Sequence, residues 1–277
     1  MTLRSPGLLG DTAARDYSRK LQLFNAFAEP ELRQAIGSLG ALRGARVLDA
    51  GCGTGEAVQW LTEAVGPGGA AIGMDLAAAH VSAACERASG RILQADVCRP
   101  PFVPRSFDLI WAVNALNHLR DPSAALRALA SLMRAGGRIA VGQSSLLADM
   151  FFAWNSRLER VTTEAVRAYY RDRYGLTEHE LSGVRSLVGL LRSAELQDVQ
   201  ARTFVLERVS PLAPADEAYL VESVFRGTWG ERLRPYLSSE DYEELACLCE
   251  PHHPQFALRR PDFHFLQTFT LVVGTVR

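Results

Sequence analysis

Three glycines at alternate positions mark the stretch of this sequence with the clearest chemical character. They are Gly51, Gly53 and Gly55, in the segment VLDAGCGTGE (47–56), where an apolar run gives way to a loop. Glycine removes side-chain bulk and admits left-handed backbone conformations, so such a loop suits close approach by another group. A phosphate, another backbone or a flat ligand would each need this little side chain.

The spacing of the glycines separates the candidate ligands. Dinucleotide-binding loops follow the pattern G-x-G-x-x-G, with a pyrophosphate at the start of the next helix. Here Glu56 stands where the third glycine of that pattern would be. Its carboxylate would repel a pyrophosphate but tolerate a ligand with ammonium and sulfonium charges. No glycine–lysine pair follows, which excludes a P-loop. The remaining interpretation is S-adenosylmethionine, with no binding of nicotinamide cofactors.

The loop lies in a chain that alternates short apolar runs with helical patterns. Before the loop, Pro30 is predicted to separate two short helices. Strands are predicted at 45–50, 70–75, 91–96, 107–113 and 137–143, with helices at 56–66, 77–88 and 122–133. Such alternation predicts a parallel sheet with helices on both faces, and ligands at the carboxyl ends of its strands. The glycine loop follows the first strand at that edge.

Roughly from position 44 to 143, the chain resembles the class I S-adenosylmethionine-dependent methyltransferases. VLDAGCGTG looks like the first motif of that family, and FDLIWAVNALNHL (107–119) looks like its fourth-strand motif. The resemblance implies an α/β fold of the Rossmann-like, doubly wound type. Its mostly parallel seven-stranded sheet would have an antiparallel last strand, plus helical cap insertions. The elements that complete the sheet are expected at 183–196, 198–209 and 263–276.

The resemblance also implies a binding site for S-adenosylmethionine as cofactor. In the family, the acidic residue ending the second strand bonds both ribose hydroxyls, and here that is Asp75; Asp96 matches the residue that receives the adenine amine. Asn114 and its neighbours would face the methionine end. The alternatives are purely structural roles, in which Asp49 caps a turn and Asp75 or Asp96 terminates a strand. The expected cofactor-binding residues are Tyr17, Asp49, Gly51, Cys52, Gly53, Gly55, Asp75, Leu76, Asp96, Val97 and Asn114.

Departures from subfamily patterns indicate the class of acceptor. WAVN (111–114) lacks the fourth-strand pattern of nucleic-acid amino-methyltransferases, and the glutamates of the protein-arginine and cyclopropane-forming classes are absent. Quinone O-methyltransferases, which are also similar here, place metal-binding glutamates and a histidine where this chain has Asn114, Asn117 and His118. Amides are poorer ligands than carboxylates for hard cations, so no metal is expected. The acceptor is expected to be a small molecule.

A second group of potential metal ligands lies in CLCEPHHP (247–254), which crowds two cysteines and two histidines together. Its spacing matches no familiar zinc pattern. Cys247 and Cys249 would point to different faces at a helix end, and the prolines fit a linker. The segment is therefore interpreted as a helix end, and activity should survive a chelator.

His118 is the first candidate for a catalytic general base. Its ordinary pKa near ~6.5 suits proton removal, and it follows the cofactor-facing strand by a few residues. The alternative is that it only braces the loop over the cofactor. Tyr169, Tyr170 and His179 are further candidates, each favoured more as a pocket wall.

The remaining segments are expected to bind the acceptor. Residues 144–181 are rich in aromatic and arginine side chains, and 211–261 show helical patterns. With N-terminal helices in 1–43, they would roof the strand ends and exclude water. The rest of this single domain, 44–143, 182–210 and 262–277, would form the Rossmann-like core. The acceptor-binding residues expected are Phe151, Phe152, Trp154, Tyr169 and Tyr170.

Bulk properties narrow the partners. A net charge of -1 gives no electrostatic reason to expect nucleic acid or an anionic membrane. No apolar run is long enough for a signal peptide or a membrane helix, and five cysteines without regular spacing argue against a disulfide framework. A cytoplasmic protein with a small-molecule acceptor is expected, and a homodimer is left open.

Three functions follow, in order of support. The first is methyl transfer to a small, partly apolar metabolite in a biosynthetic pathway. The second is a cofactor-binding protein with another role, such as a cyclase or a regulator, because a fold does not fix a function. The third is an RNA or protein methyltransferase, which the neutral charge and the missing motifs weaken. The identity of the acceptor, and the choice among O, N and C as its methylated atom, stay open.

Overall fold

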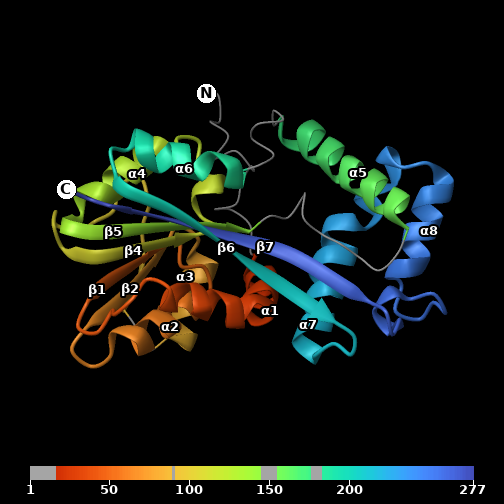
Figure 1. Cartoon of the computed structure of the whole chain (residues 1–277), viewed down its shortest axis with the longest axis horizontal. Coiled ribbons are helices and arrows are strands. Elements are labelled where there is room, and N and C mark those ends of the chain that lie inside the picture. The colour runs from red at the N-terminus through yellow and green to blue at the C-terminus, as the bar shows by residue number, and fades with distance from the viewer. Residues whose placement is uncertain (1–16, 89–90, 145–154, 176–182) are drawn as a thin grey trace.

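A single seven-stranded sheet forms the centre of the computed structural model, which describes residues 17–88, 91–144, 155–175 and 183–277. The strand order is β3-β2-β1-β4-β5-β7-β6 (Figure 1). Strands β1 to β5 pair in parallel, and β7 runs antiparallel to both β5 and β6. This topology confirms the predicted Rossmann-like fold. The strands are β1 (Arg46–Ala50), β2 (Ala70–Asp75), β3 (Arg91–Gln94), β4 (Phe107–Val113), β5 (Met133–Ser144), β6 (Gln197–Val209) and β7 (His264–Thr275).

Helices cover both faces of the sheet, and the central strand β4 shows why. Leu109 and Trp111 pack into one core with α2, while Ile110 and Ala112 pack into a second core with α4 and α6. Successive strand side chains point to opposite faces, so a continuous apolar run is buried on both sides. The helices between the strands are α2 (Glu56–Val65), α3 (Ala78–Arg87), the 3-10 turn η2 (Leu116–His118), α4 (Pro122–Ser131) and α6 (Gly183–Ser193).

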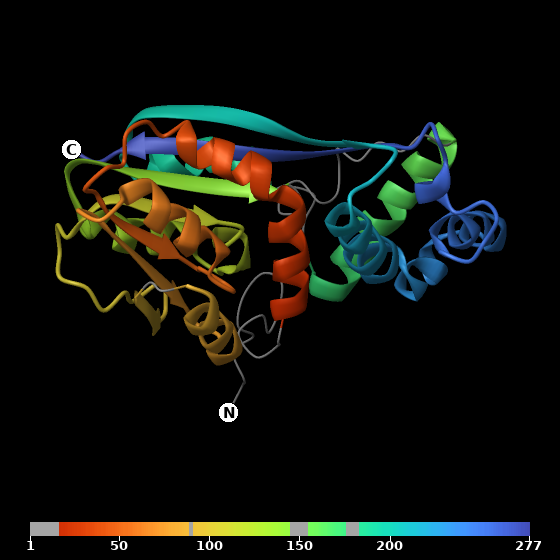
Figure 2. The ribbon, with the colours of Figure 1, turned by 90° about the horizontal axis from the view of Figure 1, so that it is seen from below.

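The N-terminal helix α1 (Ser18–Gly37) is one element with Pro30 inside it. The prediction of two short helices separated by Pro30 was wrong. Proline cannot donate to the carbonyl four residues earlier, which bends a helix without always ending it. Here Phe27 before the proline and Leu32 after it are only 1% and 3% exposed, so burial of both halves outweighs the lost hydrogen bond. Figure 2 shows the bend.

A second group of helices lies at the far end of the long β6 and β7 strands (Figure 1). We call it the helical lobe, and it confirms the helical character predicted for the described parts of 144–181 and 211–261. In Figure 2, the first half of α1 stands between the sheet and this lobe. The lobe consists of α5 (Ser156–Tyr174), α7 (Pro214–Tyr219), the π-helix η4 (Leu220–Trp229), η5 (Glu231–Tyr236), α8 (Ser239–Cys249) and η6 (Ala257–Arg259).

Arg208, near the end of β6, fastens α1 to the helical lobe. Its guanidinium bonds Glu31 of α1 and Asp216 of α7, each at 2.8 Å, and all three side chains are largely buried. It also donates to the Phe27 carbonyl and lies 4.5 Å from the centre of that ring. Removing one partner of a buried ion pair costs about 3–5 kcal/mol, because the other charge is left uncompensated. This network therefore fixes α1 in place between sheet and lobe.

Candidate cofactor and acceptor site

The glycine loop joins β1 to α2 at the carboxyl edge of the sheet. Gly51, Gly53 and Gly55 have φ angles of 85°, 52° and 88°. A Cβ atom on Gly55 would lie 2.9 Å from the Ala84 Cβ atom in α3, and one on Gly51 would lie 2.7 Å from the Ala115 Cβ atom. Glycine is therefore required both by a left-handed backbone and by neighbours of the chain itself. The sequence implies that another group lies close to this loop. Part of that contact comes from side chains of the protein itself.

The backbone N–H groups at the start of this loop are bonded within the protein. Those of Gly51 and Cys52 donate to the Met74 carbonyl at 2.8 and 2.9 Å, and that of Gly53 donates to Asp75 Oδ2 at 2.9 Å. A phosphate-binding loop offers such groups to its ligand instead. The arrangement therefore argues against a pyrophosphate, in agreement with the glycine spacing.

Asp75 ends β2, and three neighbours fix its carboxylate. Besides the bond from Gly53 to Oδ2, Oδ1 accepts from the Ala77 N–H at 2.9 Å and lies 3.2 Å from His80 Nδ1. Burial alone would raise the pKa of Asp75, but these hydrogen bonds outweigh it, and the pKa lies below its ordinary value. Each carboxylate oxygen has about two acceptor positions, so Oδ2 keeps room for a hydroxyl group.

Asp49, in β1, carries a buried oxygen, Oδ2, with no hydrogen-bond partner among the described residues. Burial raises the pKa of Asp49 well above its ordinary value, and the charges of Asp75 and Glu56 add to this. Buried polar atoms in native proteins are nearly always paired, so an unpaired one calls for an explanation. A ligand with positive charge would stabilise the ionised form and relieve the cost.

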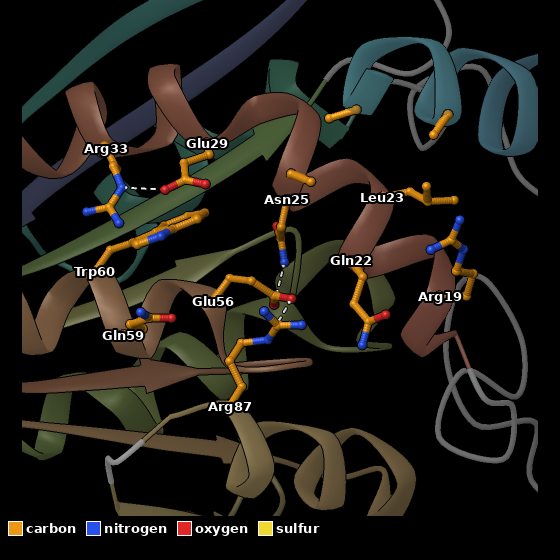
Figure 3. A pocket seen from close by; sticks show the side chains of 13 residues that line it. Arg19, Gln22, Leu23, Asn25, Glu29, Arg33, Glu56, Gln59, Trp60 and Arg87 are labelled. Carbon is orange, nitrogen blue, oxygen red and sulfur yellow. Dashed lines mark hydrogen bonds and ion pairs between the residues drawn. The ribbon is translucent and has the colours of Figure 1, made fainter. Parts of the chain in front are cut away.

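Glu56, at the start of α2, is held by contacts from three elements (Figure 3). Its Oε2 accepts from Asn25 of α1 at 2.9 Å and from the Thr54 hydroxyl at 2.7 Å, while Oε1 lies 3.1 Å from Nε of Arg87 in α3. Negative charge is also stabilised at the first turn of a helix. The Glu56 carboxylate, which the sequence analysis expects to repel a pyrophosphate, thus also holds α1 and α3 against the glycine loop.

The same clamp borders a hollow of about 450 Å³ between α1, α2, α3 and α7 (Figure 3). Every arginine that lines it has an acidic partner, so the hollow offers a ligand no uncompensated cation. These pairs are Arg19–Glu222, Arg33–Glu29, Arg33–Glu63 and Arg87–Glu56.

The residues expected at the adenine end lie at the ends of β2 and β3. Leu76 is 49% exposed, an unusual place for a large apolar side chain, while Val97 is buried. Asp96 Oδ1 accepts from the Cys98 N–H at 2.8 Å, which leaves acceptor capacity on the carboxylate. An exposed apolar side chain and a carboxylate with free acceptor capacity would suit a flat ring that carries an amine.

Two expected cofactor residues have structural roles that the sequence only partly indicated. Asn114 has a left-handed φ of 52°, and its Oδ1 accepts from the Ser144 N–H at 2.8 Å while its Nδ2 donates to the Ser144 hydroxyl at 3.2 Å. Its side chain therefore joins the ends of β4 and β5. Cys52 is buried, and a Cβ atom on Gly73 would lie 2.9 Å from its sulfur. Burial raises the pKa of the Cys52 thiol, as expected for a packing residue.

His118 ends η2, and its Nδ1 is buried without a hydrogen-bond partner among the described residues. Burial lowers the pKa of His118 to about 4, with Lys20 adding to the effect and Asp75 opposing it. The pKa near 6.5 assumed from the sequence is therefore wrong for this position, because burial and a neighbouring ammonium group disfavour the charged ring. At neutral pH the imidazole is neutral and able to accept a proton. Its role as a base stays a prediction.

A further group of side chains comes from the start of α1 and from the helical lobe. Burial raises the pKa of Tyr170 to about 12, with Tyr174 adding to the effect, Arg232 opposing it and Tyr17 also near enough to contribute. The Tyr169 ring lies 5.4 Å from that of Tyr170, between ring centres. Tyr17, Tyr169 and Tyr170 thus lie near one another, and their roles in binding stay predictions. Phe151, Phe152, Trp154 and His179 lie outside the described residues.

Three nearby residues escaped the sequence interpretation. Lys20 lies one helical turn after Tyr17, and His80 lies in the first turn after β2, where its bond to Asp75 follows from that spacing. Arg232, in η5, carries no local signal at all. The first two positions were open to inference from helical spacing, but the third depends on how the lobe folds back.

No group of three metal-ligating side chains occurs within the described ranges. In CLCEPHHP, burial raises the pKa of Cys249, and His253 Nδ1 accepts from the Gln255 N–H at 3.2 Å. The segment forms the end of α8 and a following turn. The absence of a metal stays a prediction. None of the helices in the described ranges is long and apolar enough to cross a bilayer.

Residues 48–141 match a family model described as a methyltransferase domain. The chain is 28% identical over 179 residues to the methyltransferase GfsG of Streptomyces halstedii, covering 62% of this chain and 59% of that protein. It is 29% identical over 199 residues to a malonyl-[acyl-carrier protein] O-methyltransferase of Pseudescherichia vulneris, covering 64% and 78%. The first match thus spans less than two thirds of its relative.

Solved structures share the fold at low sequence identity. The YcgJ protein of Bacillus subtilis aligns with a TM-score of 0.55 and 19% identity, over 90% of this chain and 99% of that one. The [4+2]-cyclase SpnF aligns with a TM-score of 0.51 and 15% identity, over 99% of this chain and 87% of the other. One architecture therefore accommodates different reactions.

Proposed function

We propose that this chain, whose residues 48–141 match a methyltransferase domain, is a class I S-adenosylmethionine-dependent methyltransferase that acts on a small, partly apolar metabolite. The observation that carries the proposal is the acidic site beside the glycine loop. There Asp49 has a buried oxygen with no hydrogen-bond partner in the part of the chain that the structure describes, and hydrogen bonds favour the ionised form of Asp75. Relatives named as 2-phytyl-1,4-naphtoquinone, 27-O-demethylrifamycin SV and aklanonic acid methyltransferases support a small-molecule acceptor and a biosynthetic setting.

The described residues fit the cofactor by charge and by shape. In the proposed arrangement, Asp75 holds the ribose hydroxyls, Leu76 and Asp96 receive the adenine, and Asp49 and the Asn114 backbone face the methionine end. S-adenosylmethionine, when bound, supplies an electrophilic methyl group on a positively charged sulfur. A negative site favours that charge over the neutral sulfur of S-adenosylhomocysteine.

The chain itself must hold the acceptor, exclude water and, for many acceptors, remove a proton. We assign the first two tasks to the cap formed by α1 and the helical lobe. His118 is the proposed base, because Nδ1 of its neutral ring is buried without a hydrogen-bond partner among the described residues. Its pKa is influenced by both Lys20 and Asp75. The alternative is that it braces the loop.

A role without methyl transfer, as a cyclase or a regulator, is the second candidate. The low pKa of His118 is the observation that favours it, since a group with a pKa of about 4 is a weak base. Nucleic acid is not proposed as a partner, and self-association into a homodimer stays open.

Two measurements test the proposal. Calorimetry should show that S-adenosylhomocysteine binds and that NADH does not; tighter binding of NADH would overturn the cofactor assignment. The chain is then incubated with S-adenosylmethionine labelled in the methyl group and with fractionated cell extract. A labelled small molecule supports the proposal. Binding without label supports the cyclase or regulator, and labelled RNA or protein supports the third function.

A further inference from the structure

Two cations without an acidic partner in the described part of the chain are near enough to influence each other, and one of them lies over the Tyr169 ring. Lys20 comes from α1, and Arg232 comes from η5 of the helical lobe. Lys20 lowers the pKa of His118, and Arg232 lowers the pKa values of Lys20 and Tyr170. Several other arginines on or next to these elements do have acidic partners, as in Arg19–Glu222, Arg157–Asp241 and Arg208–Glu31.

The position of Lys20 ties these charges to the proposed site of methyl transfer. Leu21, its neighbour, covers the glycine loop, since a Cβ atom on Gly53 would lie 3.0 Å from Leu21 Cδ1. Lys20 therefore belongs to the stretch of α1 that lies on the cofactor loop. Its side chain is half-buried, and its pKa is lowered by burial and by Arg232.

Lys20 is half-buried and Arg232 is exposed, and their like charges repel each other. An anion bound between them would relieve this repulsion. The cofactor side of the site has the opposite character, with Asp49, Asp75 and Glu56 close enough to influence one another. A cationic cofactor and an anionic acceptor would each find the charge that complements it.

The wall around these cations is aromatic. The Arg232 guanidinium lies 5.3 Å from the centre of the Tyr169 ring. That ring contacts Tyr170 at 5.4 Å and Tyr236 at 6.2 Å, and Tyr170 stacks on Tyr174 at 5.6 Å, all between ring centres. Such a surface suits a flat apolar body, and two monovalent cations suit a single negative charge on it.

We propose that Lys20 and Arg232 bind the carboxylate of the acceptor, which is a flat, aromatic organic acid held against Tyr170. This inference rests on the proposed function and names the chemical class of its acceptor. The carboxylate orients the acceptor, and the aromatic wall holds its body.

The test measures binding to the chain saturated with S-adenosylhomocysteine, by calorimetry. The probes are benzoate, 1-naphthoate and 2-naphthoate, each compared with its neutral amide, together with 1-naphthyl phosphate. We expect at least one carboxylate to bind about tenfold or more tightly than its amide, because a charge-assisted hydrogen bond is lost in the amide. Lys20→Met should remove this preference, and Lys20→Arg should keep it.

Arg19→Met is the matched control. It removes one positive charge from the adjacent position of α1, but Arg19 is exposed and already paired with Glu222. The preference should survive there. Arg232→Gln, in the exposed part of the lobe, provides a second test in case Lys20→Met disturbs the fold, and it should weaken the preference severalfold.

Three results would overturn the inference while leaving the proposed function intact. They are no preference for any carboxylate in a chain that binds S-adenosylhomocysteine, an equal loss in Arg19→Met, or a Lys20-dependent preference for the phosphate over all three carboxylates. Failure of the unaltered chain to bind S-adenosylhomocysteine would instead contradict the proposed function itself.

Discussion

The two faces of the site carry opposite charge and are built in different ways. The acidic face takes Asp49, Asp75 and Glu56 from β1, β2 and α2, which follow one another along the chain. The cationic face takes Lys20 and Arg232 from α1 and η5, which lie near opposite ends of it. The first face is complete within one strand–loop–helix unit and its neighbouring strand. The second exists only once the helical lobe has folded back towards α1.

This difference teaches where each kind of specificity resides. A site built from neighbouring elements changes little while the scaffold is kept, so it suits a cofactor shared by a whole family. A site assembled from distant segments changes with each insertion, so it suits an acceptor particular to one protein. Substitutions on the acidic face should therefore alter cofactor binding, and those on the cationic face should alter acceptor binding.

The largest effect is expected at His118, whose pKa is influenced by Lys20 of the cationic face and by Asp75 of the acidic face. His118→Ala should lower kcat by about 10²–10⁴, measured with the acceptor found by labelling, while the affinity for S-adenosylhomocysteine stays near that of the unaltered chain. His264→Ala is the control, because that ring is exposed and pairs with Glu207 on the edge of the sheet. A fall in kcat of less than tenfold would mean that His118 braces the loop.

The pH dependence separates base from brace independently. A base acts in its unprotonated form, so kcat/KM should fall as pH decreases through the pKa of His118 in the free protein, which is about 4. Between pH 6 and 8 this group should leave kcat/KM unchanged. The acid limb should disappear in His118→Ala, and its persistence would assign it to another group.

The next effect concerns the acidic face alone. Asp75→Ala should weaken S-adenosylhomocysteine binding by about 2–3 kcal/mol, because two hydroxyl groups lose a charged acceptor. The donors at Gly53, Ala77 and His80 lose their partner as well. Asp108→Ala is the matched control, since that carboxylate instead bonds Arg46 and Arg134 near the amino ends of the strands. Unchanged affinity in Asp75→Ala would refute the assignment.

The same contrast explains what the sequence could predict. Strand and helix periods, the glycine spacing and Asp75 at the end of β2 are local features, and from them the parallel part of the sheet and the acidic face follow. The antiparallel last strand was implied by the resemblance to the family. The bend at Pro30 could not be predicted in the same way, because a single proline either ends or bends a helix. Burial of Phe27 and Leu32 against distant elements decides the matter.

The pKa of His118 and the partners of Asn114 were beyond local reasoning for the same cause. The pKa of His118 depends on Lys20 and on burial around η2, and the side chain of Asn114 bonds Ser144 on β5. Arg232 is the extreme case, since nothing in ERLRPYL distinguishes it from the paired arginines nearby. Pairwise placement of distant helices decides such roles, and helical spacing carries no information about it.

A smaller effect is expected at the adenine end. Asp96→Ala should weaken S-adenosylhomocysteine binding by about 1 kcal/mol, because one amine is involved and Asp96 Oδ1 is already bonded to the Cys98 N–H. The deaminated analogue S-inosylhomocysteine lacks that amine and sharpens the measurement. The unaltered chain should prefer the amine, and the variant should bind both alike. An undiminished preference in Asp96→Ala would place the adenine elsewhere.

The smallest effect, and the one that tests the charge of the acidic face most directly, is expected for Asp49→Asn. Because the pKa of Asp49 in the folded chain lies well above 3.8, the folded state holds its proton more tightly than the unfolded state does. Stability therefore falls as pH rises from about that value through the raised pKa. Asparagine stays neutral, so the ligand-free variant should be more stable at pH 7 than the unaltered chain. A gain of about 1 kcal/mol would raise Tm by roughly 2–4 °C for a chain of this size.

The same substitution should act in the opposite sense on the cofactor. A positive sulfonium favours an ionised Asp49, whereas the neutral sulfur of S-adenosylhomocysteine gains less from it. The ratio of the two affinities should therefore shift towards S-adenosylhomocysteine in Asp49→Asn, measured by calorimetry at pH 7. Asp108→Asn, near the amino ends of the strands, should change neither this ratio nor the stability in the same direction. A less stable ligand-free variant with an unchanged ratio would mean that Asp49 closes a strand end, and that the negative charge of this face resides on Asp75 and Glu56.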